Sequence, residues 1–275
     1  MMKKVLAGAA LAALSLNAFA ADYSDGDIHK NDYKWMQFNL MQSVDARIPY
    51  GAQDTTYLEF EFGGRSGIFD LYGYVDYFDV LGIDGDDRDN SDNMFMKLAP
   101  RMSLDALTGK DLSFGPVQEV YLANVLNVGD SALVDTYWGV GSDIMVPWFG
   151  KVGLNFYARY VDENYGADNE SSWDGYMVSF NWFKPFYFFD NGSFISYQGY
   201  NDFKFGADEI DDQEGYANHS LESFHGIYWH SDRFAAGYGL KYFINMALVE
   251  DGDRPNGVLQ DTTGFGHYFA ITYKF

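Results

Sequence analysis

The sequence predicts an all-β fold, a transmembrane antiparallel β-barrel of twelve strands. Segments of about ten residues alternate apolar and polar side chains along most of the chain, as strands do when their two faces meet different surroundings. Aromatic residues make up 19% of the chain, and glycine is frequent, at 29 residues. The connections alternate between compact turns and longer, acidic loops. Together these features are typical of a barrel that spans a membrane.

The first twenty residues, 1–20, are predicted to be a signal peptide rather than part of the fold. Two lysines near the start precede an apolar run over residues 5–16, and Ala18-Phe19-Ala20 fits a small-x-small cleavage site. The alternative is a membrane anchor, which needs ~20 apolar residues, more than this run supplies. We therefore expect export from the cytoplasm and cleavage near Ala20/Ala21.

The remaining chain, 21–275, is predicted to be one barrel domain that begins with a polar N-terminal segment, 21–33. It contains no apolar run long enough for a spanning helix. The chain has no cysteine, which excludes a disulfide framework and thiol chemistry. Its formal charge is −22, and this acidity argues against nucleic acid or nucleotides as partners, because phosphates are repelled.

Twelve segments carry the alternation. In the first, Phe38 and Leu40 share one face while Asn39 points to the other; in the last, Ile271 and Phe275 share the apolar face. The twelve predicted strands span residues 34–44, 56–63, 68–79, 93–104, 117–126, 134–146, 152–161, 175–183, 194–205, 220–228, 234–243 and 264–275.

The connections differ in kind on the two sides. The compact set comprises residues 63–67, 105–111, 147–151, 184–192 and 230–233, and the other set comprises 45–55, 82–93, 127–133, 162–173, 206–219 and 247–263. Short turns on one side and long loops on the other are the pattern of outer-membrane barrels. We therefore expect the cell outer membrane of a Gram-negative bacterium, with long loops outside and Phe275 at the periplasmic rim.

A secreted β-sandwich is the competing architecture, since its strands also alternate. Aromatic residues near the strand ends, such as Trp138, Trp173 and Trp182, match the interface girdles of a barrel instead. A final strand that ends in an aromatic residue is what outer-membrane barrels present to their assembly machinery. That machinery, membrane lipid and lipopolysaccharide are therefore expected partners.

A twelve-stranded barrel lies between small barrels filled by side chains and wide open pores, so its wall sets selectivity. The predicted lumen faces carry tyrosines, suited to stacking on heterocycles or sugars, and charges of both signs. The alternatives are lumen filling for the tyrosines and structural ion pairing for the charges. The candidate channel-lining residues are Tyr57, Glu59, Glu61, Tyr72, Tyr74, Asp76, Lys97, Arg101, Tyr157 and Arg159.

Stretches spread through nearly the whole mature chain carry a family resemblance. They are 54–61 (DTTYLEFE), 69–76 (FDLYGYVD), 107–116 (LTGKDLSFGP), 164–167 (NYGA) with 173–176 (WDGY), and 263–266 (TGFG). Together they resemble the nucleoside-specific porins of the Tsx-like family, and within it the OmpK-type outer-membrane proteins. The resemblance implies a monomeric twelve-stranded barrel that passes nucleosides, and such proteins also resemble known phage receptors.

The leading functional hypothesis is a channel for passive, selective uptake of small solutes, with nucleosides as the solute. Acidic residues in two loops, 84–92 and 208–214, disfavour nucleotides at the mouth. The alternative is a less selective pore whose outer loops serve as a bacteriophage receptor or adhesin surface. A monomer is expected, because no strand shows a lipid face that turns polar.

No enzyme, metal site or cofactor is predicted. Residues 84–95 invite a calcium-loop reading, but an EF-hand needs glycine and glutamate where this chain has Asp89 and Phe95. The five histidines show no metal-binding spacing. His230, Ser231 and Asp232 are contiguous, and adjacent side chains of a strand diverge, so they form no catalytic relay. The alternative class, an outer-membrane lipase or protease, is therefore not favoured.

Overall fold

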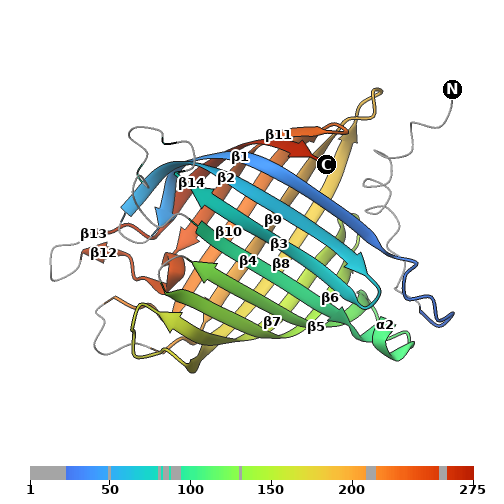
Figure 1. Ribbon diagram of the computed structural model, residues 1–275, viewed down its shortest axis with the longest axis horizontal. Coiled ribbons are helices and arrows are strands. Elements are labelled where there is room, and N and C mark those ends of the chain that lie inside the picture. The colour runs from blue at the N-terminus through green and yellow to red at the C-terminus, as the bar shows by residue number, and fades with distance from the viewer. Residues whose placement is uncertain are drawn as a thin grey trace.

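The computed structural model describes residues 23–48, 51–79, 82, 87, 94–129, 132–208, 215–253 and 259–275. Within these ranges, twelve antiparallel strands close into a barrel, which confirms the predicted fold class (Figure 1). The barrel strands are β1 (Tyr33–Ile48), β2 (Gly51–Ser66), β3 (Phe69–Phe78), β4 (Met94–Ser103), β5 (Val117–Gly129), β6 (Leu133–Val146), β7 (Gly150–Asn164), β8 (Ser172–Phe188), β9 (Phe194–Phe205), β10 (His219–His230), β11 (Phe234–Ile244) and β14 (Gly264–Lys274).

Four short elements lie outside the barrel wall. Helix α2 (Leu104–Thr108) follows β4 at the rim that carries the short turns. The helix η1 (Met246–Leu248) and the two-residue strands β12 (Gly252–Asp253) and β13 (Leu259–Gln260) belong to the connection between β11 and β14. None of the helices in the described ranges is long and apolar enough to cross a membrane.

Each predicted strand is present, but several predicted connections differ in extent, among them 127–133, which is mostly strand, and 105–111, which is part of a longer connection that contains α2. The expected loop 45–55 is mostly strand, because β1 continues to Ile48 and β2 begins at Gly51. A register shift between Ser43 and Ala46 absorbs the extra residue there, as a β-bulge does. Likewise, β8 runs through Pro185 into the predicted turn 184–192, with a bulge that accommodates the proline.

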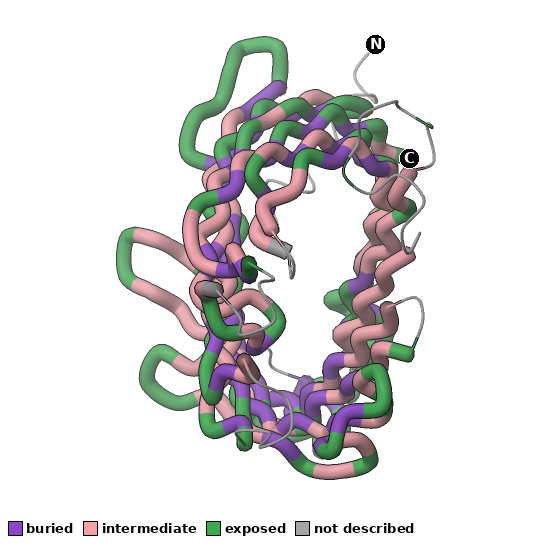
Figure 2. The backbone as a smooth tube through the Cα atoms, turned by 90° about the vertical axis from the view of Figure 1, so that its left-hand side faces the viewer, coloured by how far each residue is buried: buried purple, intermediate pink, exposed green. Residues whose placement is uncertain are grey.

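The last strand closes the barrel, as predicted. β14 pairs with β11 on one side and with β1 on the other, with Phe38 opposite Tyr273. The backbone N–H of Phe275 donates to the carbonyl of Met36 at 3.2 Å, so pairing extends to the final residue. Figure 2 shows the resulting tube along its length, with an oval rather than circular cross-section.

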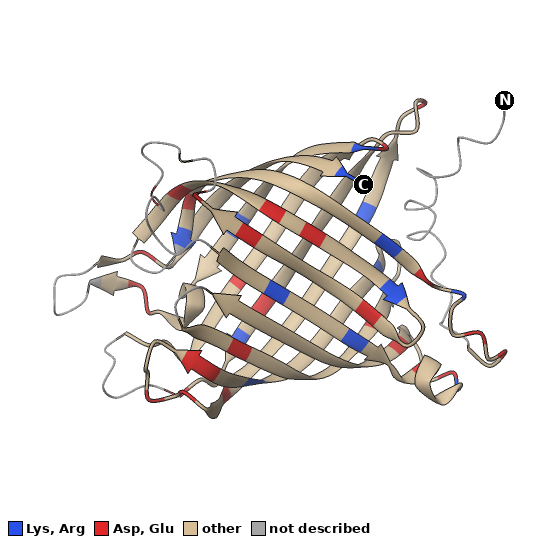
Figure 3. Cartoon of the chain, viewed as in Figure 1, with Lys and Arg blue, Asp and Glu red and all other residues tan. Residues whose placement is uncertain are grey.

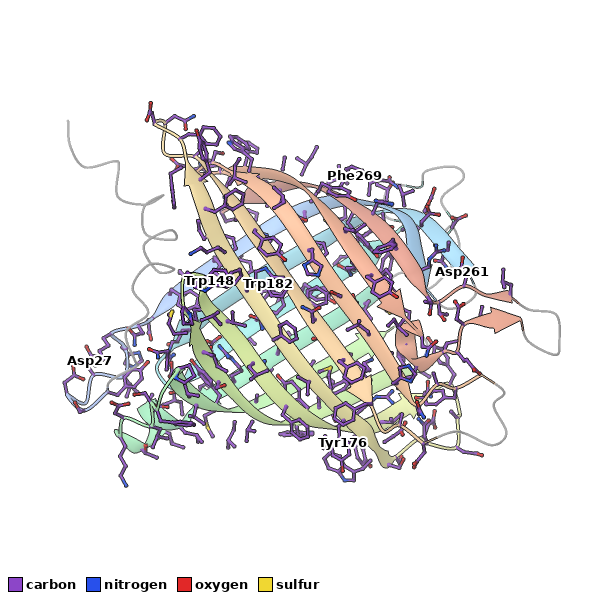
Figure 4. All side chains as sticks on the ribbon, turned by 180° about the vertical axis from the view of Figure 1, so that it is seen from behind. Asp27, Trp148, Tyr176, Trp182, Asp261 and Phe269 are labelled. Carbon is purple, nitrogen blue, oxygen red and sulfur yellow. The ribbon has the colours of Figure 1, made fainter. Side chains whose placement is uncertain are left out.

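The two faces of the wall differ as the alternation requires. Phe269 and Ile271 are 49% and 63% exposed on the outside, and Phe269 projects outward in Figure 4. On the same strand Ala270 and Thr272 are buried inside. Charged residues recur along the barrel strands in Figure 3, and most of those with ion partners face the interior. Apolar side chains therefore face lipid, and charges face the lumen.

The outer face is not uniformly apolar, contrary to the expectation from the sequence. On β9 and β10, a hydrogen bond of 2.7 Å joins the Tyr197 hydroxyl to Nδ1 of His225, and one of 3.0 Å joins Nε2 of that ring to Ser223. Ser223 then donates to Asn201 at 2.6 Å. These residues alternate in phase with Phe203, which is exposed on the outside. Because each polar group bonds to the next, the cost of exposing them to hydrocarbon falls.

The predicted N-terminal segment, 21–33, packs against the turn rim from residue 23 onward. Tyr23 is buried with Ala106, and the guanidinium of Arg65 lies 5.3 Å from its ring centre. Asp32 accepts from the backbone N–H of Gly67 at 2.8 Å, and Gly67 has a φ of +57°, which favours glycine. The segment is therefore tied to the β2–β3 turn. The signal peptide 1–20 lies outside the described residues.

Candidate functional site: the barrel lumen

One ion pair spans the lumen. Nζ of Lys97 on β4 donates to Oδ2 of Asp202 on β9 at 3.1 Å. Four strands separate β4 from β9 on one side of the barrel and six on the other, so the two residues come from nearly opposite walls. Both side chains are mostly buried, at 20% and 10% exposure. The pair therefore narrows the passage at mid-strand.

A second lysine joins this constriction. Nζ of Lys241 on β11 donates to Glu222 on β10 at 2.8 Å. The ring of Tyr200 lies 5.8 Å from the ammonium of Lys97 and 5.6 Å from that of Lys241, and the Tyr200 hydroxyl donates to Glu222. We call Lys97, Tyr200, Asp202, Glu222 and Lys241 the central cluster. Its two ammonium groups are matched by two carboxylates.

Carboxylates that form no salt bridge within the described ranges line the wall beside the central cluster. Asn39 donates to Glu59 at 2.5 Å and to Glu61 at 3.1 Å, and Gln37 donates to Glu61 at 2.6 Å. Asp76 lies opposite Glu59 in the strand register, and its Oδ1 is buried with no hydrogen-bond partner in the described part of the chain. Amide donors thus replace cations here. This wall presents hydrogen-bond acceptors to the lumen.

Tyrosines flank these acids on the same face. The Tyr72 hydroxyl donates to Glu61 at 3.0 Å, and the rings of Tyr72 and Tyr74 lie 6.2 Å apart. Tyr57 packs against Phe78 with ring centres 5.3 Å apart and is almost fully buried. The predicted residues on β2 and β3 are therefore brought together as one acidic and aromatic wall.

Arg101 and its partners lie nearer the turn rim. The guanidinium donates to Asp70 at 2.9 Å and to Asp143 at 3.0 Å, and it covers the ring of Tyr121 at 4.0 Å. Close by, Arg65 makes a bidentate pair with Glu119, at 2.6 and 2.8 Å. Both arginines thus have carboxylate partners on other strands. Their contacts tie the wall together.

Arg159 occupies the loop end of the lumen. It donates to Asp135 at 2.9 Å, to Asp174 at 3.1 Å and to the hydroxyl of Tyr216 at 3.1 Å, and only 5% of its side chain is exposed. Tyr216 belongs to the connection after β9, where burial raises its pKa above the usual range. Arg159 therefore links the wall to a surface loop.

Tyr157 is buried within an apolar cluster of the wall. It meets Tyr137 edge to face, with ring centres 6.3 Å apart, and packs with Met177 and Val125. Its neighbours fill the lumen side of β5 to β8. Tyr157 is thus separated from the acidic wall of β2 and β3.

Sequence reasoning missed four members of the central cluster: Tyr200, Asp202, Glu222 and Lys241. A signal for two of them was present, since Tyr200 and Asp202 alternate in phase on one strand. The pairing of Asp202 with Lys97 across the barrel could not be predicted from the local alternation of side chains. Within the described ranges no group of three or more His, Asp or Glu side chains could hold a metal ion. Most of the rejected calcium loop, 84–95, lies outside those ranges.

Comparisons with known proteins agree with this architecture. A sequence model described as "Nucleoside-specific channel-forming protein, Tsx" matches residues 30–275. The outer membrane protein OmpK of Vibrio parahaemolyticus is 56% identical, and the nucleoside-specific channel-forming protein Tsx of Salmonella typhimurium is 33% identical; each alignment covers 100% of both chains. A solved NanC porin, 6% identical, covers 87% of this chain and 100% of its own with a TM-score of 0.50, a likeness of fold alone.

These findings confirm the sequence-based resemblance and the expected location. The chain is an outer-membrane β-barrel channel, and its Tsx relatives are channel-forming proteins rather than enzymes. By the match over residues 30–275 and by full-length identity to its members, the chain belongs to the family of nucleoside-specific channel-forming proteins, Tsx.

Proposed function

We propose that the channel passes neutral nucleosides by passive diffusion, and that the wall of β2 and β3 together with the central cluster contacts them. The central cluster carries this proposal. Its lysines and carboxylates satisfy one another, so a neutral solute passes without breaking an ion pair. The Tsx relatives, described as nucleoside-specific, support the same solute.

The chemistry of the wall suits the two halves of a nucleoside. Tyr74 and Tyr200 offer flat faces for stacking on a heterocyclic base. Glu59, Glu61 and Asp76 supply acceptors for sugar hydroxyls or base N–H groups. We assign contact roles to Tyr57, Glu59, Glu61, Tyr72, Tyr74, Asp76 and Lys97, and scaffold roles to Arg101, Tyr157 and Arg159.

Single-channel recording in planar bilayers tests this proposal. Adenosine and thymidine are expected to block the ionic current, while their monophosphates block it hardly at all, because the dianion meets unpaired carboxylates. Equal block by nucleosides and monophosphates would overturn the proposal. Tyr200→Leu is the matched variant, and it should weaken nucleoside block by about tenfold, the equivalent of roughly 1.4 kcal/mol of lost stacking.

A second candidate function concerns the outer loops. The connections after β9 and β11 are joined by backbone hydrogen bonds, from Ala217 to Leu248 at 2.7 Å and from Glu250 to Gly215 at 2.8 Å. Two connections held in one arrangement offer a defined surface to a bacteriophage or host molecule. Loop substitutions that abolish adsorption while conductance stays normal would support a receptor role. Loss of adsorption and conductance together would refute a receptor role that is separate from the channel.

Export and assembly complete the proposal. We infer that residues 1–20 are removed near Ala20/Ala21, and that the barrel assembly machinery and lipopolysaccharide contact the mature chain as a monomer. Mass spectrometry of the protein from outer membranes tests the first point, since the expected N-terminal residue is Ala21. Any other N-terminus refutes it.

A further inference from the structure

A cavity at the turn rim is separate from the lumen site. Strands β9 and β10 pair along their whole length, so the β8–β9 turn lies beside the β10–β11 turn at the end of the barrel that carries α2 (Figure 1). Between the two turns is a cavity of about 340 Å³, lined by Asn191, Ser193, Ser231, Asp232, Arg233 and Phe234. Ser231 and Asp232, two of the three contiguous residues that the sequence analysis excluded as a catalytic relay, belong to this lining.

Two opposite charges in this cavity have no ion partner. Asp232 and Arg233 are adjacent and exposed, and neither forms a salt bridge with any residue of the described ranges. The guanidinium of Arg233 donates only to the hydroxyl of Tyr273, at 3.2 Å. An exposed carboxylate and an exposed guanidinium, side by side, present a dipole to a ligand.

The turn that carries these charges is fixed from below. The N–H of Ser231 donates to the carbonyl of Phe234 at 2.8 Å, and the N–H of Lys274 donates to the carbonyl of Arg233 at 2.8 Å. Nζ of Lys274 donates to the carbonyl of Ser231, also at 2.8 Å. The backbone is therefore ordered, while the exposed Asp232 carboxylate and the remaining N–H groups of Arg233 stay accessible to a ligand, which lowers the entropic cost of binding.

Phe234 lines the cavity, and further exposed aromatic side chains lie on the outer face of the strands that lead to the two turns. Trp229 and Tyr187 lie in one register row through Ile195, and both are largely exposed. Phe234 meets Tyr273 edge to face with ring centres 5.5 Å apart. Aromatic residues in this position mark the boundary between acyl chains and headgroups. The cavity therefore opens at the headgroup level of the periplasmic leaflet.

We propose that this cavity binds the headgroup of a zwitterionic glycerophospholipid that carries a primary ammonium. Its phosphodiester contacts the guanidinium of Arg233, whose forked donors match phosphate oxygens. Its ammonium contacts the carboxylate of Asp232, and its acyl chains lie along Trp229 and Phe234. Phosphatidylglycerol has a neutral glycerol in place of the ammonium and so gives Asp232 no cation, and a quaternary ammonium has no N–H to donate.

Native mass spectrometry of the full mature chain, with defined lipids added, tests the assignment. Phosphatidylethanolamine should remain bound at least tenfold more than phosphatidylglycerol or phosphatidylcholine, the difference expected from one charge-assisted hydrogen bond. Arg233→Gln should lose binding of phosphatidylethanolamine, whereas Asp232→Asn should lose the discrimination against phosphatidylglycerol. Asp190→Asn, outside the cavity on the same pair of turns, should leave both unchanged.

Several results would overturn the proposal. Equal retention of the three lipids by the wild type would mean that the cavity does not distinguish between their headgroups. Unchanged binding in Arg233→Gln and Asp232→Asn would place the lipid elsewhere. Competition by soluble glycerophosphoethanolamine as strong as that by the lipid would show a site for soluble phosphoesters. Both variants lie outside the lumen, so normal conductance confirms that each has folded.

Discussion

Lys97 and Asp202 join two walls of the barrel that are almost opposite each other, at a distance of 3.1 Å across the lumen. The barrel that this link crosses has an oval cross-section (Figure 2). Both charges are poorly solvated, and each residue supplies the counter-charge that its partner needs. We therefore expect the charge selectivity of the channel to depend on both residues.

Replacing Lys97 and replacing Asp202 should shift the ion selectivity of the channel in opposite directions. Lys97→Met leaves the Asp202 carboxylate uncompensated and favours cations, while Asp202→Asn leaves the ammonium and favours anions. A change of about 1 kcal/mol corresponds to roughly a fivefold change in the permeability ratio. Reversal potentials in a salt gradient measure it.

The double variant Lys97→Met with Asp202→Asn should return selectivity toward that of the wild type. Its conductance should be higher, since the link is gone. Lys184→Gln, on the outer face of β8, is the control and should change neither quantity. Wild-type reversal potentials in both single variants would contradict a role for the pair in selectivity.

The buried pair of Arg65 and Glu119 should matter for stability. Glu119→Gln leaves the buried guanidinium without its charged partner, and breaking a buried pair this way costs roughly 3–5 kcal/mol. The temperature at which the folded band disappears in a gel-shift assay should fall accordingly. Lys30→Gln breaks the exposed pair with Asp25 and should cost less than ~1 kcal/mol. Equal effects of the two changes would refute the structural role.

The connection after β7 should loosen in acid. Glu170 accepts from the backbone N–H groups of Asn164 and Gly166, and these bonds lower its pKa below the usual range. Because the pKa is depressed in the folded state, the stabilisation is present above the ordinary glutamate pKa and is lost as pH falls through the depressed value. The protection of the amides of residues 164–170 against exchange, relative to the intrinsic rate at each pH, should fall over that range. Glu170→Ala, which removes the acceptor oxygen, should show low protection of these amides at every pH.

Deleting Phe275 should impair assembly in the outer membrane. The residue contributes a backbone hydrogen bond to Met36 and an edge contact with Phe38, ring centres 5.6 Å apart. The amount of heat-modifiable protein in outer membranes should drop, whereas Phe265→Ala at the other end of β14 should assemble normally. Refolding of the deletion variant in detergent separates the causes. Normal refolding with poor assembly in cells supports recognition by the machinery; normal assembly refutes it.

Strand existence could be predicted because lipid and lumen impose opposite demands on alternate residues, as at Phe38 and Asn39. Strand ends could not be predicted as well. β1 reaches Ile48 because β2 supplies a pairing partner across a bulge, and Ala46 alone carries no sign of that. The length of a strand depends on its neighbour, which local pattern does not include.

The candidate site also contains residues that could be predicted from the sequence and contacts that could not. Glu59, Glu61 and Asp76 were predictable because they follow one another in phase on two adjacent strands. The partner of Lys97 was not, because the cross-lumen distance depends on the oval shape of the whole barrel. Arg159 was assigned to the lumen from its phase, yet its contact with Tyr216 depends on how a surface loop folds back over the mouth.

The closure between β1 and β14 has a topological consequence for engineering. An even number of strands returns the chain to the rim where it began, so Tyr33 at the start of β1 and Phe275 both lie at the α2 end (Figure 1). We expect this rim to face the periplasm, so a peptide fused at either end of the barrel should stay on the periplasmic side. To display a sequence on the cell surface, it must be inserted between paired strands at the opposite rim, for example between β12 and β13.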